Sequence, residues 1–164
     1  MPQSKTTRWL TIANIILGYC LSNTAAYAFC PEPSDPSLFT NGVFNVPPNP
    51  APTSASVGNL QQLNLYDGGL LARSFEANAG SEVNISGGTV RDYFEANSGS
   101  VVNISGGAIG NSFNAYSGSA VCICGGSVGI YFGANSGSVV NVSGGTLGGF
   151  ISAYGSEVNI SGGT

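Results

Sequence analysis

The chain repeats itself every 19 residues, and this period limits its possible folds more than any other feature. Phenylalanine recurs at this spacing, alanine follows it by two positions, and valine heads successive copies of V-N-I-S-G-G or a close variant. The matching positions are Phe75, Phe94, Phe113 and Phe132; Ala77, Ala96, Ala115 and Ala134; and Val83, Val102, Val121 and Val140. A strict period with short apolar alternations and Gly-Gly breaks is typical of a solenoid.

Each repeat can be divided into three short strands. In Glu82–Ser86, Val83 and Ile85 alternate with polar residues and therefore share one face. Phe94-Glu95-Ala96 alternates in the same way, and a third apolar piece centres on Val90. Glycine-rich segments separate the pieces, and glycine supplies the positive φ of a tight corner at no steric cost.

Stacked repeats would pair their strand backbones at about 4.8 Å and lay inward side chains on copies of themselves. Several coils would then bury an apolar face that one coil cannot bury. We therefore predict an all-β fold, a right-handed single-stranded parallel β-helix (β-solenoid) with about 19 residues per coil. The hand follows from the general preference for right-handed parallel crossovers. Abundant glycine and β-branched apolar positions oppose helix, and the fixed register opposes a disordered low-complexity chain.

Residues 1–28 have the pattern of a secretory signal peptide. Lys5 and Arg8 precede a mostly apolar run, Trp9–Leu21, and Ala26-Tyr27-Ala28 fits the small-x-small cleavage rule. The run is too short and too interrupted for a good transmembrane helix. We expect cleavage after Ala28 and a secreted or cell-surface protein, with a retained anchor as the alternative.

Residues 29–56 differ from the rest because they hold seven of the eight prolines, which favours extended, unpaired backbone. Within them, residues 38–46 can be read as a small hairpin around Asn41-Gly42 that caps the first coil. A linker with a chance Asn-Gly is the alternative. Repeats fill residues 57–164, and the chain stops inside a regular copy. Because solenoids need a terminal cap, we expect the repeats to be truncated at Thr164.

Charge limits the partners. Without Lys5 and Arg8, two arginines remain against eight acidic residues, a net charge of −6. Such a chain cannot neutralise several phosphates, so we expect no nucleic-acid partner. The same argument disfavours anionic membrane surfaces, and we expect membrane attachment only through an anchor outside these residues.

Three cysteines remain after cleavage, Cys30, Cys122 and Cys124, and an odd number leaves at least one unpaired or bonded to another molecule. Cys122-Ile123-Cys124 stands where other copies have Asn and Ser, so both thiols should project from one face. One interpretation is drift at two exposed positions that tolerate small residues. A disulfide to Cys30 or between the two, a metal site, and a covalent link to a partner stay open, although zinc needs more ligands than two thiolates.

No pattern in the sequence supports catalysis. Gly125–Gly129 fits G-x-S-x-G around Ser127, but the sequence has no histidine to act as its base. Calcium-binding glycine-rich repeats need an aspartate in each copy, and only Asp92 lies near a matching position. Arg91 and Asp92 are the sole charged pair at a corner, which we interpret as solvated surface. We predict no catalytic, cofactor-binding or metal-binding residue.

Asparagine also recurs with the period, followed each time by serine two residues later, at Asn84, Asn103, Asn141 and Asn159. Each is a formal N-glycosylation sequon. A ladder of amides hydrogen-bonded along the stack is a sufficient reason for the pattern.

The unit F-x-A-x-x-G-S-x-V-N-I-S-G-G-x-V, over about residues 63–164, resembles the tandem repeats of large secreted bacterial proteins. Some of these are described as aggregation-factor-core or adhesin-like. The period also resembles that of filamentous haemagglutinin-type β-helices. The resemblance implies a pectate-lyase-like or haemagglutinin-like β-helix on or outside the cell, and it is specific to the repeat rather than to an activity.

We therefore expect a secreted structural or adhesive protein without catalytic activity or cofactor in this chain. Its partners would be an extracellular or cell-surface polysaccharide or protein, or further copies of itself. The alternative is the N-terminal part of an extracellular polysaccharide lyase or hydrolase on the same fold. An ice- or surface-binding ladder is a third interpretation, which the irregular residues after each Gly-Gly make weaker.

Overall fold

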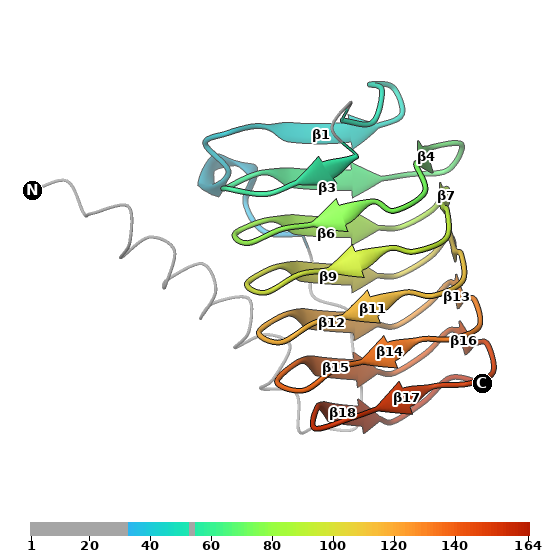
Figure 1. Ribbon diagram of the computed structural model, residues 1–164. Coiled ribbons are helices and arrows are strands. Elements are labelled where there is room, and N and C mark those ends of the chain that lie inside the picture. The colour runs from blue at the N-terminus through green and yellow to red at the C-terminus, as the bar shows by residue number, and fades with distance from the viewer. Residues whose placement is uncertain (1–32, 53–54) are drawn as a thin grey trace, which may run out of the picture.

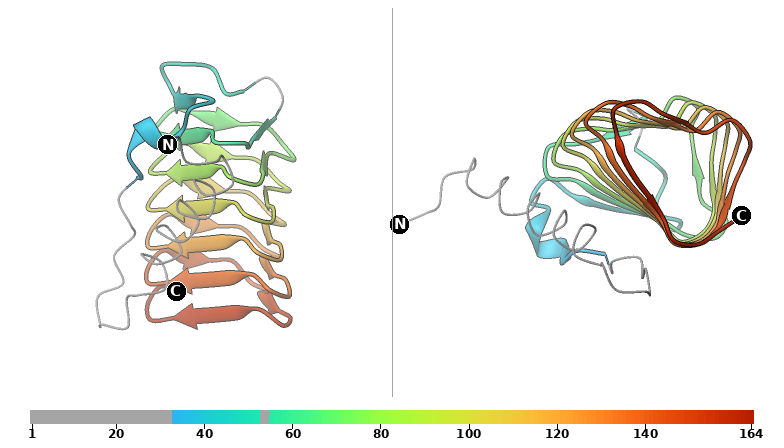
Figure 2. Two further views of the ribbon diagram at one scale, coloured as in Figure 1. Left: turned by 90° about the vertical axis from the view of Figure 1, so that its left-hand side faces the viewer. Right: turned by 90° about the horizontal axis from the view of Figure 1, so that it is seen from below.

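The computed structural model describes residues 33–52 and 55–164, and its strands wind into a column of parallel coils (Figure 1). The column is an all-β solenoid of about six turns with coils about 19 residues apart, which confirms the predicted fold class. Seen from one end, the coils lie over one another in a three-sided outline (Figure 2). The proposed signal peptide of residues 1–28 lies outside the described residues.

Each side of the column is one parallel sheet. Sheet A contains β1 (Val43–Val46), β3 (Gln62–Leu65), β6 (Glu82–Ile85), β9 (Val101–Ile104), β12 (Ala120–Ile123), β15 (Val139–Val142) and β18 (Glu157–Ile160). Sheet B contains β2 (Ser56–Val57), β5 (Glu76–Ala77), β8 (Glu95–Ala96), β11 (Asn114–Ala115), β14 (Gly133–Ala134) and β17 (Ser152–Ala153). Sheet C contains β4 (Leu70–Leu71), β7 (Thr89–Val90), β10 (Ala108–Ile109), β13 (Ser127–Val128) and β16 (Thr146–Leu147).

Strand register reproduces the sequence period. Val83 pairs with Val102, and Val102 pairs with Val121. Where the first described repeat is one residue longer, Gln62 still pairs with Glu82. Parallel pairing fixes which residues face each other. The extra residue therefore lies in a corner between strands, and the inward faces stay aligned.

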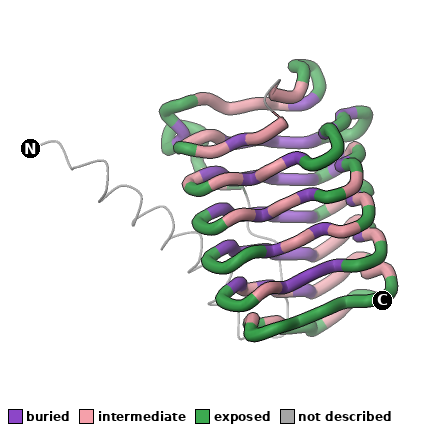
Figure 3. Tube along the Cα trace, in the orientation of Figure 1, coloured by how far each residue is buried: buried purple, intermediate pink, exposed green. Residues whose placement is uncertain are grey.

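The core is a set of stacked ladders inside the column (Figure 3). Phe75, Phe94, Phe113 and Phe132 are all fully or almost fully buried, as the period predicts. The rings of Phe94 and Phe113 stack with centroids 4.8 Å apart, and those of Phe113 and Phe132 lie 5.1 Å apart. Such aromatic pairs add about 0.5–1.5 kcal/mol to the free energy gained by burial.

In V-N-I-S-G-G and its close variants, the second glycine has positive φ and turns the chain out of sheet A. At Gly107, φ is +75°, and an added Cβ would lie 2.6 Å from the carbonyl oxygen of Gly87 in the preceding coil. The position requires glycine both for its left-handed conformation and for its closeness to backbone.

On the outer face of sheet A, asparagine amides bond from coil to coil. Asn64 Nδ2 donates to Asn45 Oδ1 over 2.9 Å, Asn84 to Asn64 over 3.0 Å, and Asn103 to Asn84 over 2.9 Å. The predicted amide ladder is therefore present. Asn64, Asn84 and Asn103 are buried, so this part of the ladder holds coils together and is not displayed to solvent.

The N-terminal segment does not form the predicted hairpin. Val43–Val46 pairs with Gln62–Leu65 in parallel, so β1 is the first strand of sheet A and not one arm of an antiparallel pair. The preceding residues form a short 3-10 helix, η1 (Pro36–Leu38). The Asn-Gly signal describes a local turn, whereas the pairing of Val43–Val46 is decided by the apolar register of the coil beneath it.

Residues just before η1 lie against the outer face of sheet A. The Ser34 N–H donates to Glu82 Oε1 over 2.9 Å, and Gln62 Nε2 donates to the Ser34 carbonyl oxygen over 3.0 Å. Glu82 and Gln62 are both fully buried. The segment thus covers polar side chains that alternation alone would place in solvent.

We predict that Phe113→Ala lowers the free energy of unfolding by about 3–5 kcal/mol, because it leaves a cavity between two stacked rings. The urea midpoint followed by circular dichroism measures the loss. Tyr154→Ala is the control, since Tyr154 is 81% exposed and its removal should change stability by less than about 0.5 kcal/mol. Equal effects of the two substitutions would contradict a core centred on the phenylalanine ladder.

Candidate functional site

A row of side chains, all exposed except the half-buried Ser112, runs along the corner where each strand of sheet C turns into sheet B. We call it the aromatic corner and define it by Ser74, Tyr93, Ser112, Tyr131 and Phe150. The first four each precede a phenylalanine of the buried ladder. All five have positive φ, between 57° and 64°. Their left-handed backbone turns the chain sharply, so the following residue can point inward.

The backbone of the corner is fixed by the next coil. The Tyr93 N–H donates to the Asn111 carbonyl oxygen over 2.8 Å, and the Tyr131 N–H donates to that of Gly149 over 3.1 Å. These bonds explain why the strained conformation persists. They do not explain the side chains, because glycine adopts this conformation at lower cost than tyrosine or phenylalanine.

Burial does not explain the aromatic residues either. Tyr93 is 44% exposed, Tyr131 54% and Phe150 73%. Rings that lie in solvent on a strained backbone contribute little to stability, and residues of this kind concentrate at binding surfaces. The corner is therefore the strongest candidate for a functional surface in the described part of the chain.

Two contacts order the rings. The Tyr131 and Phe150 rings stack with centroids 5.3 Å apart and planes 18° from parallel. The Arg73 guanidinium lies over the Tyr93 ring, 4.6 Å from its centroid, within range of a cation–π interaction. The corner thus has a neutral aromatic end and an end that carries positive charge.

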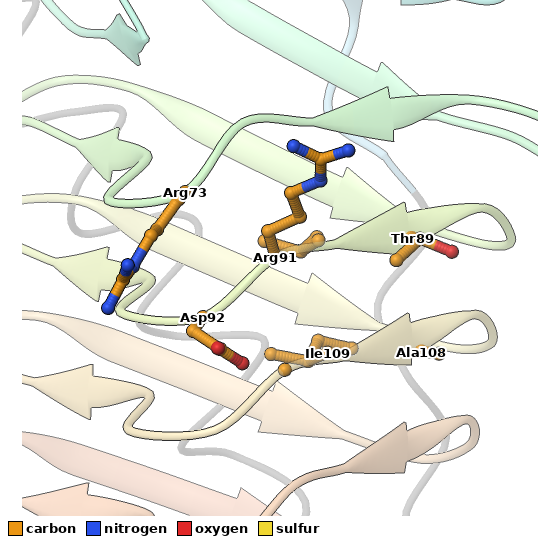
Figure 4. A pocket seen from close by; sticks show the side chains of 8 residues that line it. Arg73, Thr89, Arg91, Asp92, Ala108 and Ile109 are labelled. Carbon is orange, nitrogen blue, oxygen red and sulfur yellow. The ribbon is translucent and has the colours of Figure 1, made fainter.

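On the sheet C side of the corner, a shallow hollow of about 350 Å³ is lined by Arg73, Arg91 and Asp92 together with sheet C residues (Figure 4). The side chains of Arg73 and Arg91 point in opposite directions along the column (Figure 4). The structure thus brings Arg73 beside Arg91 and Asp92, the charged pair identified in the sequence. The guanidinium groups of Arg73 and Arg91 do not converge on one point.

Asp92 has a structural role. Its Oδ1 accepts the Asn111 N–H over 2.8 Å, and Asn111 Oδ1 accepts the Ile130 N–H over 3.0 Å. Each side chain therefore satisfies a backbone donor of the next coil. The interpretation of Arg91 and Asp92 as solvated surface holds for exposed Arg91 and needs correction for Asp92, which is half-buried.

On the sheet B side, a second hollow of about 470 Å³ lies beside the stacked rings of Tyr131 and Phe150. Its lining also includes Gly133, Asn114 and Ser112. Gly133 pairs with Asn114 on one side and with Ser152 on the other. Gly133 is buried, and the Asn114 amide leans over it into the place that a side chain would take, so this amide borders the space beside the rings. We call this space the Gly133 hollow.

A tyrosine on the same side of the column contacts an acidic residue. The Tyr116 hydroxyl donates to Glu95 Oε1 over 3.4 Å. Partial burial, and secondly the negative charge of Glu95, raises the pKa of Tyr116. The phenol therefore remains a neutral hydrogen-bond donor throughout the neutral pH range.

Cys122 and Cys124 are both disulfide-bonded, and the described residues include no free cysteine. Cys122 is buried and Cys124 is half-buried, so the expected pair of exposed positions is not found. Ile123 points into the core as predicted. Cys30, the third candidate, lies outside the described residues.

Cys122 also interrupts the asparagine ladder. It pairs with Asn103, whose Oδ1 is buried and has no hydrogen-bond partner. A further amide bond joins Asn159 to Asn141, where the ladder is present again. A buried acceptor without a partner costs about 1–3 kcal/mol, so the cysteine comes at a local loss of stability.

The other sequence motifs do not assemble into a site in the described residues. Ser127 is exposed and pairs with Ala108 and Thr146, which occupy the same position of neighbouring coils. The described part of the chain contains no group of three metal-ligating side chains. Among the described helices, none is long and apolar enough to cross a membrane.

Comparison with known proteins found no matching family model, no similar curated protein and no similar solved structure. The assignment of a function therefore depends on the corner itself. Sequence analysis missed the corner, although its signal is visible in the residue before each ladder phenylalanine, which reads Ser, Tyr, Ser and Tyr. Exposure and backbone conformation were needed to distinguish that position from the core.

The break in the amide ladder predicts a coupling between positions 103 and 122. In a Cys124→Ser background, we compare Cys122→Asn with Cys122→Ala, each combined with Asn103 or with Asn103→Ala. Restoring the bond should give a coupling free energy of about 1 kcal/mol in urea unfolding. Additive effects would show that an amide at position 122 does not extend the ladder.

Proposed function

We propose that the chain is a secreted structural or adhesive protein that binds extracellular polysaccharide along the aromatic corner. The observation that carries the proposal is the exposure of Tyr93, Tyr131 and Phe150 on strained backbone, at a corner position that serine fills in two other coils. Aromatic rings with neighbouring polar groups are typical of ligand-binding surfaces.

The regularity of the column supports adhesion more than turnover. Paired strands of sheet A are separated by 18 to 20 residues along the chain, as in Val139 with Glu157 and Gln62 with Glu82. Over the described coils no inserted loop rises beside the corner, so the surface is an open ridge. An open ridge suits an extended polymer that passes over several coils.

The opposite wall of the column is less suited to display. Three of the six asparagines of the amide ladder (Asn64, Asn84 and Asn103) and the carboxylate of Glu82 are buried and take part in hydrogen bonds within the chain. A partner surface of Asn and Glu ladders on sheet A is therefore less well supported than the corner.

The alternative is part of a polysaccharide lyase or hydrolase, and the hollow with Arg73, Arg91 and Asp92 is the observation that favours it. A positively charged hollow would suit an acidic sugar. The engagement of Asp92 with the backbone of the next coil argues against a free base there. Release of reducing ends or unsaturated products from polygalacturonate or alginate would favour the enzyme.

We predict that the purified full-length chain is retained by at least one polysaccharide in affinity electrophoresis, and that the triple variant Tyr93→Ser/Tyr131→Ser/Phe150→Ser is not. Serine is the matched replacement because Ser74 and Ser112 occupy the same corner position with positive φ. The gels would contain neutral polymers (β-glucan, xylan, galactomannan, dextran) and acidic ones (polygalacturonate, alginate).

The thermal midpoint of the triple variant is measured alongside, and we expect only a modest decrease because the rings of Tyr93, Tyr131 and Phe150 are 44%, 54% and 73% exposed. Absence of retention by every polymer, or equal retention of the triple variant, would contradict the proposed function.

A further inference from the structure

One departure from the repeat lies in the lining of the Gly133 hollow. In sheet B the outward position is Glu76, Glu95 and Asn114 in three successive coils, then Gly133, then Ser152. The glycine lines a space beside the only pair of corner rings that stack on each other among the described residues.

The lining of the hollow combines an apolar wall with neutral polar groups. Tyr131 and Phe150 form a continuous aromatic surface, and no charged residue lines the space. Asn114 Nδ2 donates to the Ser112 carbonyl oxygen over 3.1 Å, which fixes the amide. A Cβ at Gly133 would meet Asn114 Oδ1, so this acceptor leans over the glycine and into the hollow.

This chemistry distinguishes between possible occupants. An anionic ligand would find no cation in the lining, because Arg73 and Arg91 line the other hollow. A peptide could not add as a strand, since the Gly133 N–H already bonds to Phe113 and the Ser152 N–H to Phe132. A sugar ring offers a C–H face for the aromatic wall and hydroxyl groups for Asn114 and the serines. The volume of about 470 Å³ lies within the usual range of small-ligand sites, about 300–1,000 Å³.

We propose that the Gly133 hollow binds one ring of a neutral polysaccharide, with the C–H face of the sugar against Tyr131 and Phe150 and its hydroxyl groups toward Asn114. This inference rests on the proposed function and makes it more specific. It assigns the ligand to the uncharged class and places one binding subsite in a defined pair of coils.

Two single variants test the subsite. Tyr131→Ser removes half of the aromatic wall, and Gly133→Asn fills the space with a side chain that the preceding coil already has at that position. Asn114 can swing aside to make room because only the end of its side chain is in the way. The matched control is Tyr93→Ser, at the same corner position and with the same φ of 64° as Tyr131, but outside the hollow.

We expect wild-type protein to bind one or more of β-glucan, xylan, galactomannan and dextran in affinity electrophoresis. Tyr131→Ser and Gly133→Asn should each weaken that binding at least about tenfold, whereas Tyr93→Ser should have a clearly smaller effect. Circular dichroism and the thermal midpoint confirm folding of each variant. If Tyr131→Ser fails to fold, Gly133→Asn decides the question alone.

The outcomes separate the two proposals. Binding of acidic polymers only, or unchanged binding of both hollow variants while the corner triple variant loses it, overturns the subsite and leaves the proposed function standing. Loss of neutral-polymer binding in all three single variants to the same extent also overturns the subsite, because the hollow would then have no special part. If wild type binds none of the polymers, both proposals fail.

Discussion

Parallel pairing of identical segments in register is the constraint on which the rest of this structure depends. Each coil satisfies the backbone of its neighbours, and each inward side chain packs against its own copy one period away. A residue in this fold therefore acts as one member of a row. Its contribution to the stability of the protein depends on the neighbouring members of the row, and its surface chemistry is repeated along the column.

Departures from the repeat consequently stand out as local events. Cys122 removes one amide from a ladder and leaves the Asn103 acceptor without a partner. Gly133 removes one side chain from a row, and the Asn114 amide leans into its place beside a hollow lined by Tyr131 and Phe150. In both places the neighbouring coils keep the backbone unchanged, so the chain alters its surface chemistry without altering its fold. This separation allows a regular column to carry a specific binding position.

The core could be predicted almost completely from the sequence, because the alternation within each strand and the fixed period together determine which residues face inward. The phenylalanine, alanine and valine ladders and the amide ladder are where the period places them. The first strand was predicted wrongly, since Asn41-Gly42 is a local turn signal and the partner of Val43–Val46 lies 19 residues away. The candidate site was missed because alternation places the residue before an inward phenylalanine outside the core but does not tell whether another segment covers it.

The sequence by itself determined the coil, its period and its core, since alternation and glycine placement are local properties that repeat. Only the tertiary structure decided which outward residues remain in solvent. Segment 33–38 covers part of sheet A and buries Glu82 and Gln62, whereas the corner turns Tyr131 and Phe150 outward on left-handed backbone held by the next coil. Exposure depends on what packs against a residue from elsewhere in the chain, and that information exists only once the coils are stacked.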